Sequence, residues 1–127
     1  MEEIYKENLL DHYKNPKNYG KMMNPHIHKE DSNPLCGDVI EIFIRVKDGK
    51  AESVSFDGKG CVISQATASM LTDELKGKPL SEIQGMERED ILDLIGLNLT
   101  PSRIKCAMLP LITIKKGIIE YESKKVS

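Results

Sequence analysis

Three cysteines and one aspartate carry the chemistry that this sequence offers most clearly. Cys36, Cys61 and Cys106 lie far apart in the chain, and their odd number does not suit a disulfide framework. A thiolate binds soft metals and attacks sulfur, and a thiol near the start of a helix ionises more readily than a free one. The three cysteines are therefore either inert buried thiols or members of one site.

Asp38 is the natural fourth member of such a site. It stands two residues after Cys36, so an extended chain would point its carboxylate to the same side as the thiol. The alternative is an aspartate that caps a turn beside Gly37. Three thiolates and one carboxylate would hold zinc tetrahedrally or an iron–sulfur cluster, and the hard oxygen would be the most exchangeable ligand.

The three histidines are weaker ligand candidates. We expect His12 on a partly exposed helix surface, and His26 and His28 as a surface pair on one face of a short strand. The sequence contains no glycine-rich phosphate loop, no His-Glu-x-x-His helix and no Gly-x-Ser-x-Gly elbow. The candidate chemistry therefore rests on the cysteines and Asp38.

A β-hairpin is expected ahead of Cys61. The segment 39–46 alternates apolar and polar residues, and a second strand follows over 51–56. Asp48-Gly49 indicates the turn between them, and we expect a three-residue loop over 48–50. A short edge strand over 26–29 would complete a small antiparallel sheet.

The pairing register of this hairpin determines which residues meet at its open end. A three-residue loop pairs Ile42 with Phe56 and keeps the apolar face intact, whereas a two-residue loop pairs Ile42 with Ser55. Extended to the open end of the hairpin, the first register makes Cys36 and Cys61 neighbours.

Helices account for most of the remaining chain. Amphipathic spacing predicts helices over 2–15 and from Cys61 to Lys76, and shorter ones over 81–84 and 88–95. Proline is tolerated best in the first turn of a helix, so we expect the last helix to begin near Pro110, just after Cys106.

Length and composition favour one α+β domain over residues 1–127. The chain has 39% hydrophobic residues and a net charge of -2, which gives no reason to expect nucleic acid or an anionic membrane as a partner. No apolar run approaches the ~20 residues of a membrane helix, and the acidic start Met1-Glu2-Glu3 does not look like a secretory signal. We expect a cytoplasmic protein with helices packed on one face of a small antiparallel sheet.

Four ordered segments, spread over nearly the whole chain, resemble one protein family. They are Asp11-His12-Tyr13-Lys14-Asn15-Pro16-Lys17-Asn18, Asn33-Pro34-Leu35-Cys36-Gly37-Asp38, Gly60-Cys61-Val62-Ile63-Ser64-Gln65-Ala66-Thr67-Ala68-Ser69 and Arg103-Ile104-Lys105-Cys106-Ala107. Together they resemble the IscU/SufU/NifU N-terminal family of iron–sulfur cluster assembly scaffold proteins. The resemblance implies a small antiparallel sheet with helices on one face, as the patterns above also do.

The resemblance also implies a function and a set of partners. Such a scaffold accepts persulfide sulfur from a cysteine desulfurase, builds a [2Fe-2S] cluster with iron and with electrons from a donor such as ferredoxin, and passes the cluster to apo proteins. It is an assembly platform and not an enzyme. Zinc is the metal expected in the absence of a cluster, and a homodimer is compatible with the resemblance.

Carried over by position, the resemblance assigns roles to individual residues. Cys36, Asp38, Cys61 and Cys106 match the ligand set, and replacement of the aspartate characteristically stabilises the bound cluster. Cys106 resembles the sulfur-accepting thiol on a mobile loop, where Lys105 and Arg103 would help to hold it ionised. Tyr5 matches a tyrosine used in chain-to-chain contacts, although it also fits the apolar stripe of its own helix.

This sequence departs from the family pattern near the third cysteine. Lys105 stands where IscU-type members usually have histidine, which strengthens Asp38 as the ligand. The segment around Cys106 looks like SufU, the zinc-holding branch, yet the insertion of that branch has no place between Cys61 and Cys106. The chaperone element Leu-Pro-Pro-Val-Lys appears only as Leu99-Thr100-Pro101-Ser102-Arg103, which leaves chaperone dependence open.

Three functions therefore stay open at the level of sequence. The first is a cluster assembly scaffold. The second is a SufU-like zinc-dependent sulfurtransferase that activates a cysteine desulfurase. The third is a structural zinc domain with no role in sulfur transfer.

Overall fold

The computed structural model describes residues 2–34 and 37–126, so the predicted ligand Cys36 lies outside the described residues. The elements in chain order are α1 (Glu2–Lys14), β1 (Ile27–Asn33), β2 (Asp38–Lys47), β3 (Lys50–Lys59), α2 (Val62–Leu75), α3 (Leu80–Gln84), α4 (Arg88–Ile95) and α5 (Pro101–Val126). Across the described ranges, none of the helices is both long and apolar enough to cross a membrane.

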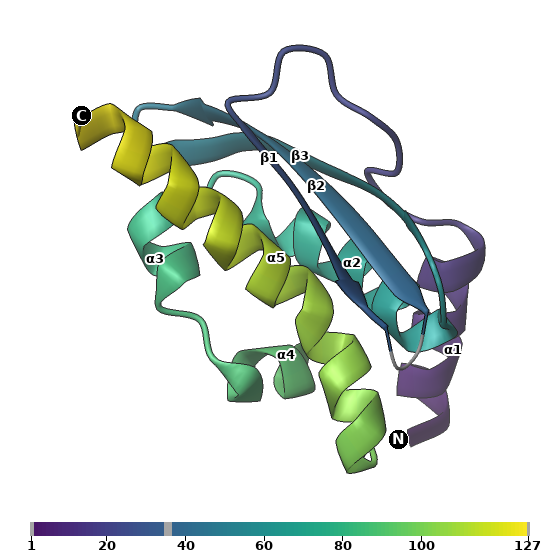
Figure 1. Ribbon diagram of the computed structural model, residues 1–127. Coiled ribbons are helices and arrows are strands. Elements are labelled where there is room, and N and C mark those ends of the chain that lie inside the picture. Colours follow the sequence, from purple (N-terminus) through teal and green to yellow (C-terminus); the bar gives the residue numbers. More distant parts are fainter. Residues whose placement is uncertain (1, 35–36, 127) are drawn as a thin grey trace.

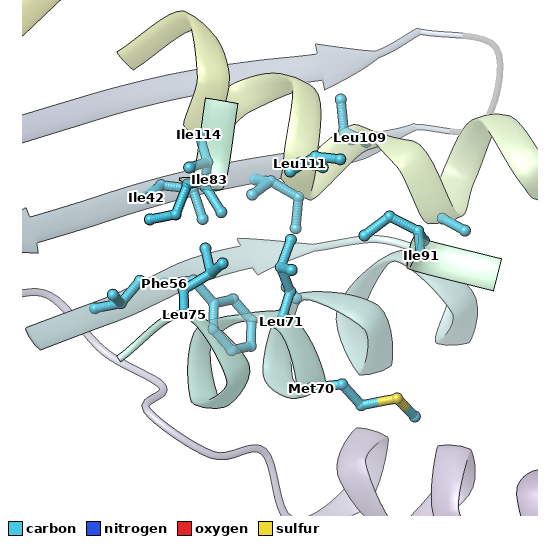
Figure 2. Close-up of a cluster of buried hydrophobic side chains, with 14 of the residues drawn as sticks. Ile42, Phe56, Met70, Leu71, Leu75, Ile83, Ile91, Leu109, Leu111 and Ile114 are labelled. Carbon is cyan, nitrogen blue, oxygen red and sulfur yellow. The ribbon is translucent and has the colours of Figure 1, made fainter. Parts of the chain in front are cut away.

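The three strands form an antiparallel sheet in the order β1-β2-β3. Figure 1 shows α5 running diagonally across the sheet with α2 on the same side. Ile40, Ile42 and Ile44 of β2 point to this side and are fully buried. They meet apolar residues of both helices, such as Leu71 and Ile114, in the core drawn in Figure 2. The predicted α+β fold with helices on one face of a small sheet is confirmed.

The hairpin has the predicted register but a different turn. Ile42 pairs with Phe56, as expected. The predicted three-residue loop is wrong, because the turn consists of Asp48 and Gly49 alone, with φ angles of 54° and 75°. A β-bulge in the ladder beside Arg45 shifts the pairing by one residue and so restores the apolar face.

The last helix is longer than predicted. It begins at Pro101, a first-turn position that proline suits, and runs through Pro110. The expectation that the helix begins near Pro110 is wrong, and Cys106 consequently lies inside a helix and not ahead of one. Pro110 cannot donate an N–H to the carbonyl of Cys106, but it is buried between Leu109 and Leu111 of the core. Packing therefore outweighs the local cost of proline.

Ser69 of α2 bonds both α1 and the segment that follows it. The Lys17 backbone N–H lies 2.7 Å from the Ser69 Oγ that accepts its hydrogen bond, and His12 Nδ1 lies 2.7 Å from the same oxygen. Leu9 is the buried apolar residue of α1. His12 is half-buried, in agreement with the partly exposed helix position expected for it.

Two ion pairs join the C-terminal half of α5 to β1. Lys29 forms an ion pair with Glu120 at 2.6 Å, and Lys116 forms one with Asp31 at 2.7 Å. Between these pairs the two elements approach so closely that a Cβ added at Gly117 would lie 2.8 Å from Ile27 Cγ2. The last helix and the first strand are thus joined along their length.

Candidate metal centre

Three potential metal ligands from distant parts of the chain meet at one end of the sheet. Asp38 is the first residue of β2, Cys61 precedes α2, and Cys106 lies in the second turn of α5. Each offers one ligand atom, and these atoms all lie within 4.8 Å of one another. Among the described residues, no other group of histidine, cysteine and acidic side chains is placed to hold a metal ion.

The carboxylate of Asp38 is buried and held by the backbone. The Cys61 N–H donates a hydrogen bond to Asp38 Oδ1 at 2.7 Å, and the side chain has no exposed surface. Gly60 leaves the space that the carboxylate occupies, since a Cβ at Gly60 would lie 2.1 Å from Asp38 Oδ1. Gly60 also has a φ of 140°, which side-chain-bearing residues rarely adopt. Asp38 therefore depends on a glycine at this position.

Cys61 is the N-cap residue of α2. Its extended backbone lets the Ser64 N–H donate to Cys61 Sγ at 3.5 Å, and the Ser64 hydroxyl donates to the Cys61 carbonyl at 3.2 Å. The sulfur therefore lies at the positive end of the α2 dipole, with a backbone N–H directed at it. The half-exposed Cys61 is thus placed as a ligand that solvent or a partner can reach.

Cys106 approaches the site from the packed side. Its side chain is only 2% exposed, whereas its neighbours Lys105 and Arg103 are exposed. Adjacent residues on a helix point in directions about 100° apart, so Lys105 points away from Cys106, whereas Arg103, three residues earlier, lies on the same side of α5. The expected mobile-loop position of Cys106 is wrong for this conformation, because α5 begins five residues earlier, at Pro101.

The donor set fits a tetrahedral metal ion. Cys61 Sγ lies 3.6 Å from Asp38 Oδ2. An ion bound at ~2.3 Å from sulfur and ~2.1 Å from oxygen separates two tetrahedral ligands by roughly 3.6 Å. Cys106 Sγ lies within 4.8 Å of both, so two sulfurs and one carboxylate leave one further tetrahedral position, for which Cys36 is the predicted donor.

The histidines are engaged elsewhere. His26 Nδ1 accepts a hydrogen bond from the Val46 N–H at 2.8 Å, and the His28 ring stacks on Phe43 with ring centroids 4.7 Å apart. His28 also pairs with Glu41 on the side of the sheet that faces away from the helices. Both histidines are exposed, in agreement with the surface explanation.

Tyr5 packs within its own chain. A Cβ at Gly96 would lie 2.3 Å from Tyr5 Cδ1, so the ring sits directly on the turn after α4. The side chain keeps 37% of its surface exposed. The apolar-stripe explanation accounts for this contact, and a role in chain-to-chain contacts stays a prediction.

Two residues that shape the site were not singled out in the sequence. Gly60 makes room for Asp38, and Ser64 binds both the sulfur and the carbonyl of Cys61. The usual capping signal could not have identified Ser64, because it has glutamate or glutamine three residues after the N-cap.

Comparison with known proteins identifies the family. Residues 4–127 match the family described as NifU-like N terminal domain. The chain belongs to this family. It is 37% identical to the iron–sulfur cluster assembly scaffold protein IscU of Escherichia coli K12, with 95% of this chain and 96% of the relative covered. It is 35% identical to the zinc-dependent sulfurtransferase SufU of Bacillus subtilis, with 96% and 94% covered.

Solved structures place this member of the NifU-like N-terminal family among similar folds. A putative scaffold protein of the SUF system from Fervidobacterium islandicum superposes with a TM-score of 0.80 at 27% identity, covering 91% of this chain and 97% of the other. A NifU-like N-terminal protein from Brucella abortus superposes with a TM-score of 0.79 over 97% of both chains, and its 18% identity shows the fold alone.

The alignment with the Bacillus protein also shows a difference in length. It runs over 139 positions, more than the 127 residues of this chain, so at least 12 of these positions have no counterpart here. The sulfurtransferase therefore has residues within the aligned region that this family member lacks.

Proposed function

We propose that this chain is a scaffold for iron–sulfur cluster assembly. In this proposal it accepts sulfur from a cysteine desulfurase and iron, builds a [2Fe-2S] cluster as its cargo, and passes the cluster to apo proteins. The ligands proposed for the cargo are Cys36, Asp38, Cys61 and Cys106. The observation that carries the proposal is the convergence of the Asp38, Cys61 and Cys106 donor atoms within 4.8 Å. The relatives named as cluster assembly scaffolds support it.

Cys106 is the proposed sulfur acceptor. Its thiolate attacks the outer sulfur of the desulfurase persulfide, the S–S bond there breaks, and the desulfurase thiolate leaves as a new persulfide forms on Cys106. Two electrons from a ferredoxin-type donor then cleave that persulfide to sulfide and regenerate the thiolate. The chain holds the growing cluster as bound cargo until the cluster is passed on, and for this reason we propose a platform and not an enzyme.

The burial of Cys106 puts a condition on this transfer. A thiol that is 2% exposed cannot meet a persulfide on another protein without a local movement. The segment of α5 before Pro110 is the proposed moving part, because proline interrupts the helix hydrogen bonds there. Lys105, which is exposed, is proposed to steer the partner or to stabilise the thiolate once the segment has moved.

Anaerobic reconstitution tests the scaffold proposal. Protein incubated with iron, cysteine and a desulfurase is expected to develop the visible absorption of a [2Fe-2S] cluster. Asp38→Ala is expected to make the cluster longer lived, because its most exchangeable ligand is removed. Asp93→Ala, which removes an exposed carboxylate of α4, is the matched control and is expected to behave as wild type. Failure of both wild type and Asp38→Ala to bind iron would contradict the proposal.

The second candidate is a SufU-like zinc-dependent sulfurtransferase. It is favoured by the 35% identity to the Bacillus protein and by the absence of histidine before Cys106. Asp38, Cys61 and Cys106 would hold the zinc, which would keep the thiols ionised. This candidate predicts stoichiometric zinc in the purified protein and faster desulfurase turnover. Stimulation that persists after zinc removal would count against it.

A structural zinc domain is the remaining alternative. The variant Cys106→Ser distinguishes it from the scaffold and from the sulfurtransferase. A purely structural site predicts that this variant loses its folded state, whereas a transfer site predicts a folded protein that no longer accepts sulfur. Circular dichroism and mass detection of the persulfide distinguish the two results. We also propose that residues 1–127 form a single domain, supported by the family match over 4–127.

A further inference from the structure

A second feature lies on the surface next to the metal centre. A groove of about 540 Å³ opens between the C-terminal end of α1 and the end of β3. Its lining includes Tyr13, Lys14, Tyr19, Lys59 and Gly60. The family resemblance assigns no role to this groove.

The groove is positively charged within a chain whose net charge is -2. Lys14 and Lys59 are both exposed, and neither makes an ion pair among those found in the described part of the chain. The carboxylate of Asp57 pairs with neither lysine; its Oδ1 accepts hydrogen bonds from the Tyr19 hydroxyl at 2.9 Å and the Gly58 N–H at 2.7 Å. Two unpaired ammonium groups are therefore available to an anionic ligand.

Aromatic rings supply the remaining contact surface. Tyr13 and Tyr19 keep 41% and 53% of their surface exposed, and Tyr19 is held by an edge-to-face contact with Phe56 at 5.2 Å between ring centroids. A ring that is fixed in place loses little entropy on binding, and tyrosine is enriched at protein interfaces for this reason. The groove thus combines a ring that is held in place, Tyr19, with exposed cations.

Gly60 connects the groove to the metal centre. It lines the groove, and its Cα side that lacks a side chain faces the Asp38 carboxylate, where a Cβ would lie 2.1 Å from Asp38 Oδ1. The next residue is Cys61. A ligand in the groove would therefore lie beside Gly60, which contacts the proposed ligand Asp38 and precedes the proposed ligand Cys61.

We propose that this groove docks an acidic segment of a protein that delivers to, or receives from, the Asp38–Cys61 end of the metal centre. The assignment of that partner's role rests on the proposed function. Both lysines are exposed and the groove is open, which suits a chain segment whose neighbours add further contacts. A free small anion would instead call for buried charges that enclose it.

Peptide binding to the full chain, without added metal, tests this proposal. The probe is a blocked hexapeptide of alternating aspartate, glutamate and glycine, and its amide analogue has asparagine and glutamine in their places. The amide signals of Gly58 and Gly60 in proton–nitrogen NMR spectra are expected to shift saturably with the acidic peptide at low salt. The analogue is expected to leave them unchanged, and added salt is expected to weaken the shift.

Charge reversal provides the matched comparison. Lys14→Glu with Lys59→Glu is expected to weaken peptide binding at least ten-fold. Lys47→Glu with Lys50→Glu reverses two exposed lysines at the other end of the hairpin and is expected to change it less than two-fold. Equal weakening by both pairs, shifts confined to another surface, or no saturable shift would overturn the proposal.

Two further results separate the groove from its alternatives. Citrate that binds as tightly as the peptide would make this a small-anion site and overturn the assignment to a protein segment. Peptide binding that survives in a chain unable to bind iron or zinc would uphold the groove while the proposed function fails. Cluster assembly that proceeds unchanged in a chain that does not bind the peptide would uphold the proposed function and overturn the proposal for the groove.

Discussion

Gly60 is the residue on which the geometry of the candidate centre depends most directly. It separates the last residue of β3 from Cys61, and its backbone conformation carries the chain from the sheet edge into α2. The absence of a side chain here lets a buried carboxylate lie against the backbone, as described above. A residue that binds nothing itself thus determines where Asp38 lies.

Replacing Gly60 should therefore cost both stability and metal affinity. Gly60→Ala is expected to lower the free energy of unfolding by about 2 kcal/mol or more, because of the positive φ and the overlap with Asp38. Urea denaturation measures the first effect, and competition with a zinc indicator measures the loss of affinity. Gly49→Ala is the control, since its φ is 75° and no atom lies within 4 Å of the added Cβ. Equal losses in both variants would contradict the role given to Gly60.

At the scale of elements, the hairpin and the last helix show what local pattern can and cannot predict. The pairing of Ile42 with Phe56 was predictable, because one face of the sheet is buried and a one-residue slip would expose its apolar side chains. The two-residue turn and its compensating bulge were not predictable, because a three-residue loop without a bulge would bury the same residues of the sheet. The start of α5 was missed because the proline rule is local, whereas the burial of Pro110 is a property of the assembled core.

Gly117 illustrates the same conflict between local propensity and packing. Alanine is favoured over glycine by ~1 kcal/mol inside a helix, so a local rule predicts that Gly117→Ala stabilises α5. The added Cβ would lie 2.8 Å from Ile27 Cγ2 and 3.2 Å from Lys29 Cβ. We expect Gly117→Ala to lower the free energy of unfolding by about 1–2 kcal/mol in urea denaturation, since α5 and β1 must separate.

A second glycine controls for helix propensity. Gly85, which ends α3, has a φ of −83°, and an added Cβ would come no closer than 3.5 Å to its neighbours. Gly85→Ala is expected to leave stability unchanged or to raise it by up to ~1 kcal/mol. A Gly117→Ala variant that is more stable than wild type would show that α5 and β1 leave room for the added methyl group.

At the scale of the whole molecule, the candidate centre depends on how α5 packs across the sheet and against β1. Cys106 reaches Asp38 only because α5 packs across the sheet, and no spacing in the sequence reports that crossing. The predicted hairpin register makes Cys36 and Cys61 neighbours, but only the family resemblance adds Cys106 to them. Long-range packing therefore limits what sequence reasoning alone can assemble.

The ion pair between Asp31 and Lys116 makes this crossing sensitive to pH. The hydrogen bond from the Lys116 ammonium is the main reason that the pKa of Asp31 lies below its ordinary value. A carboxyl group whose pKa is lowered by folding stabilises the fold above its unfolded pKa of ~3.9, and this contribution is lost as the pH falls through the folded pKa. The pair should thus stabilise the protein at neutral pH and not in acid.

Asp31→Asn is expected to lower the free energy of unfolding at pH 7 by less than ~1 kcal/mol, as for other partly exposed pairs. The difference from wild type should shrink towards zero at the lowest pH at which both proteins remain folded. Urea denaturation across this pH range measures it, and a double-mutant cycle with Lys116→Met isolates the pair. A difference that does not change with pH would assign the effect to another interaction.

The hydrogen bond between the Cys61 N–H and Asp38 has a consequence for how a metal would be bound. One carboxylate oxygen, Oδ1, is already engaged by a backbone that α2 holds in place. The other oxygen, Oδ2, lies 3.6 Å from Cys61 Sγ, so we expect Asp38 to coordinate a shared metal through this single oxygen. Asp38 would thus fill one of the four coordination positions of the metal, and it would release the metal by breaking one bond.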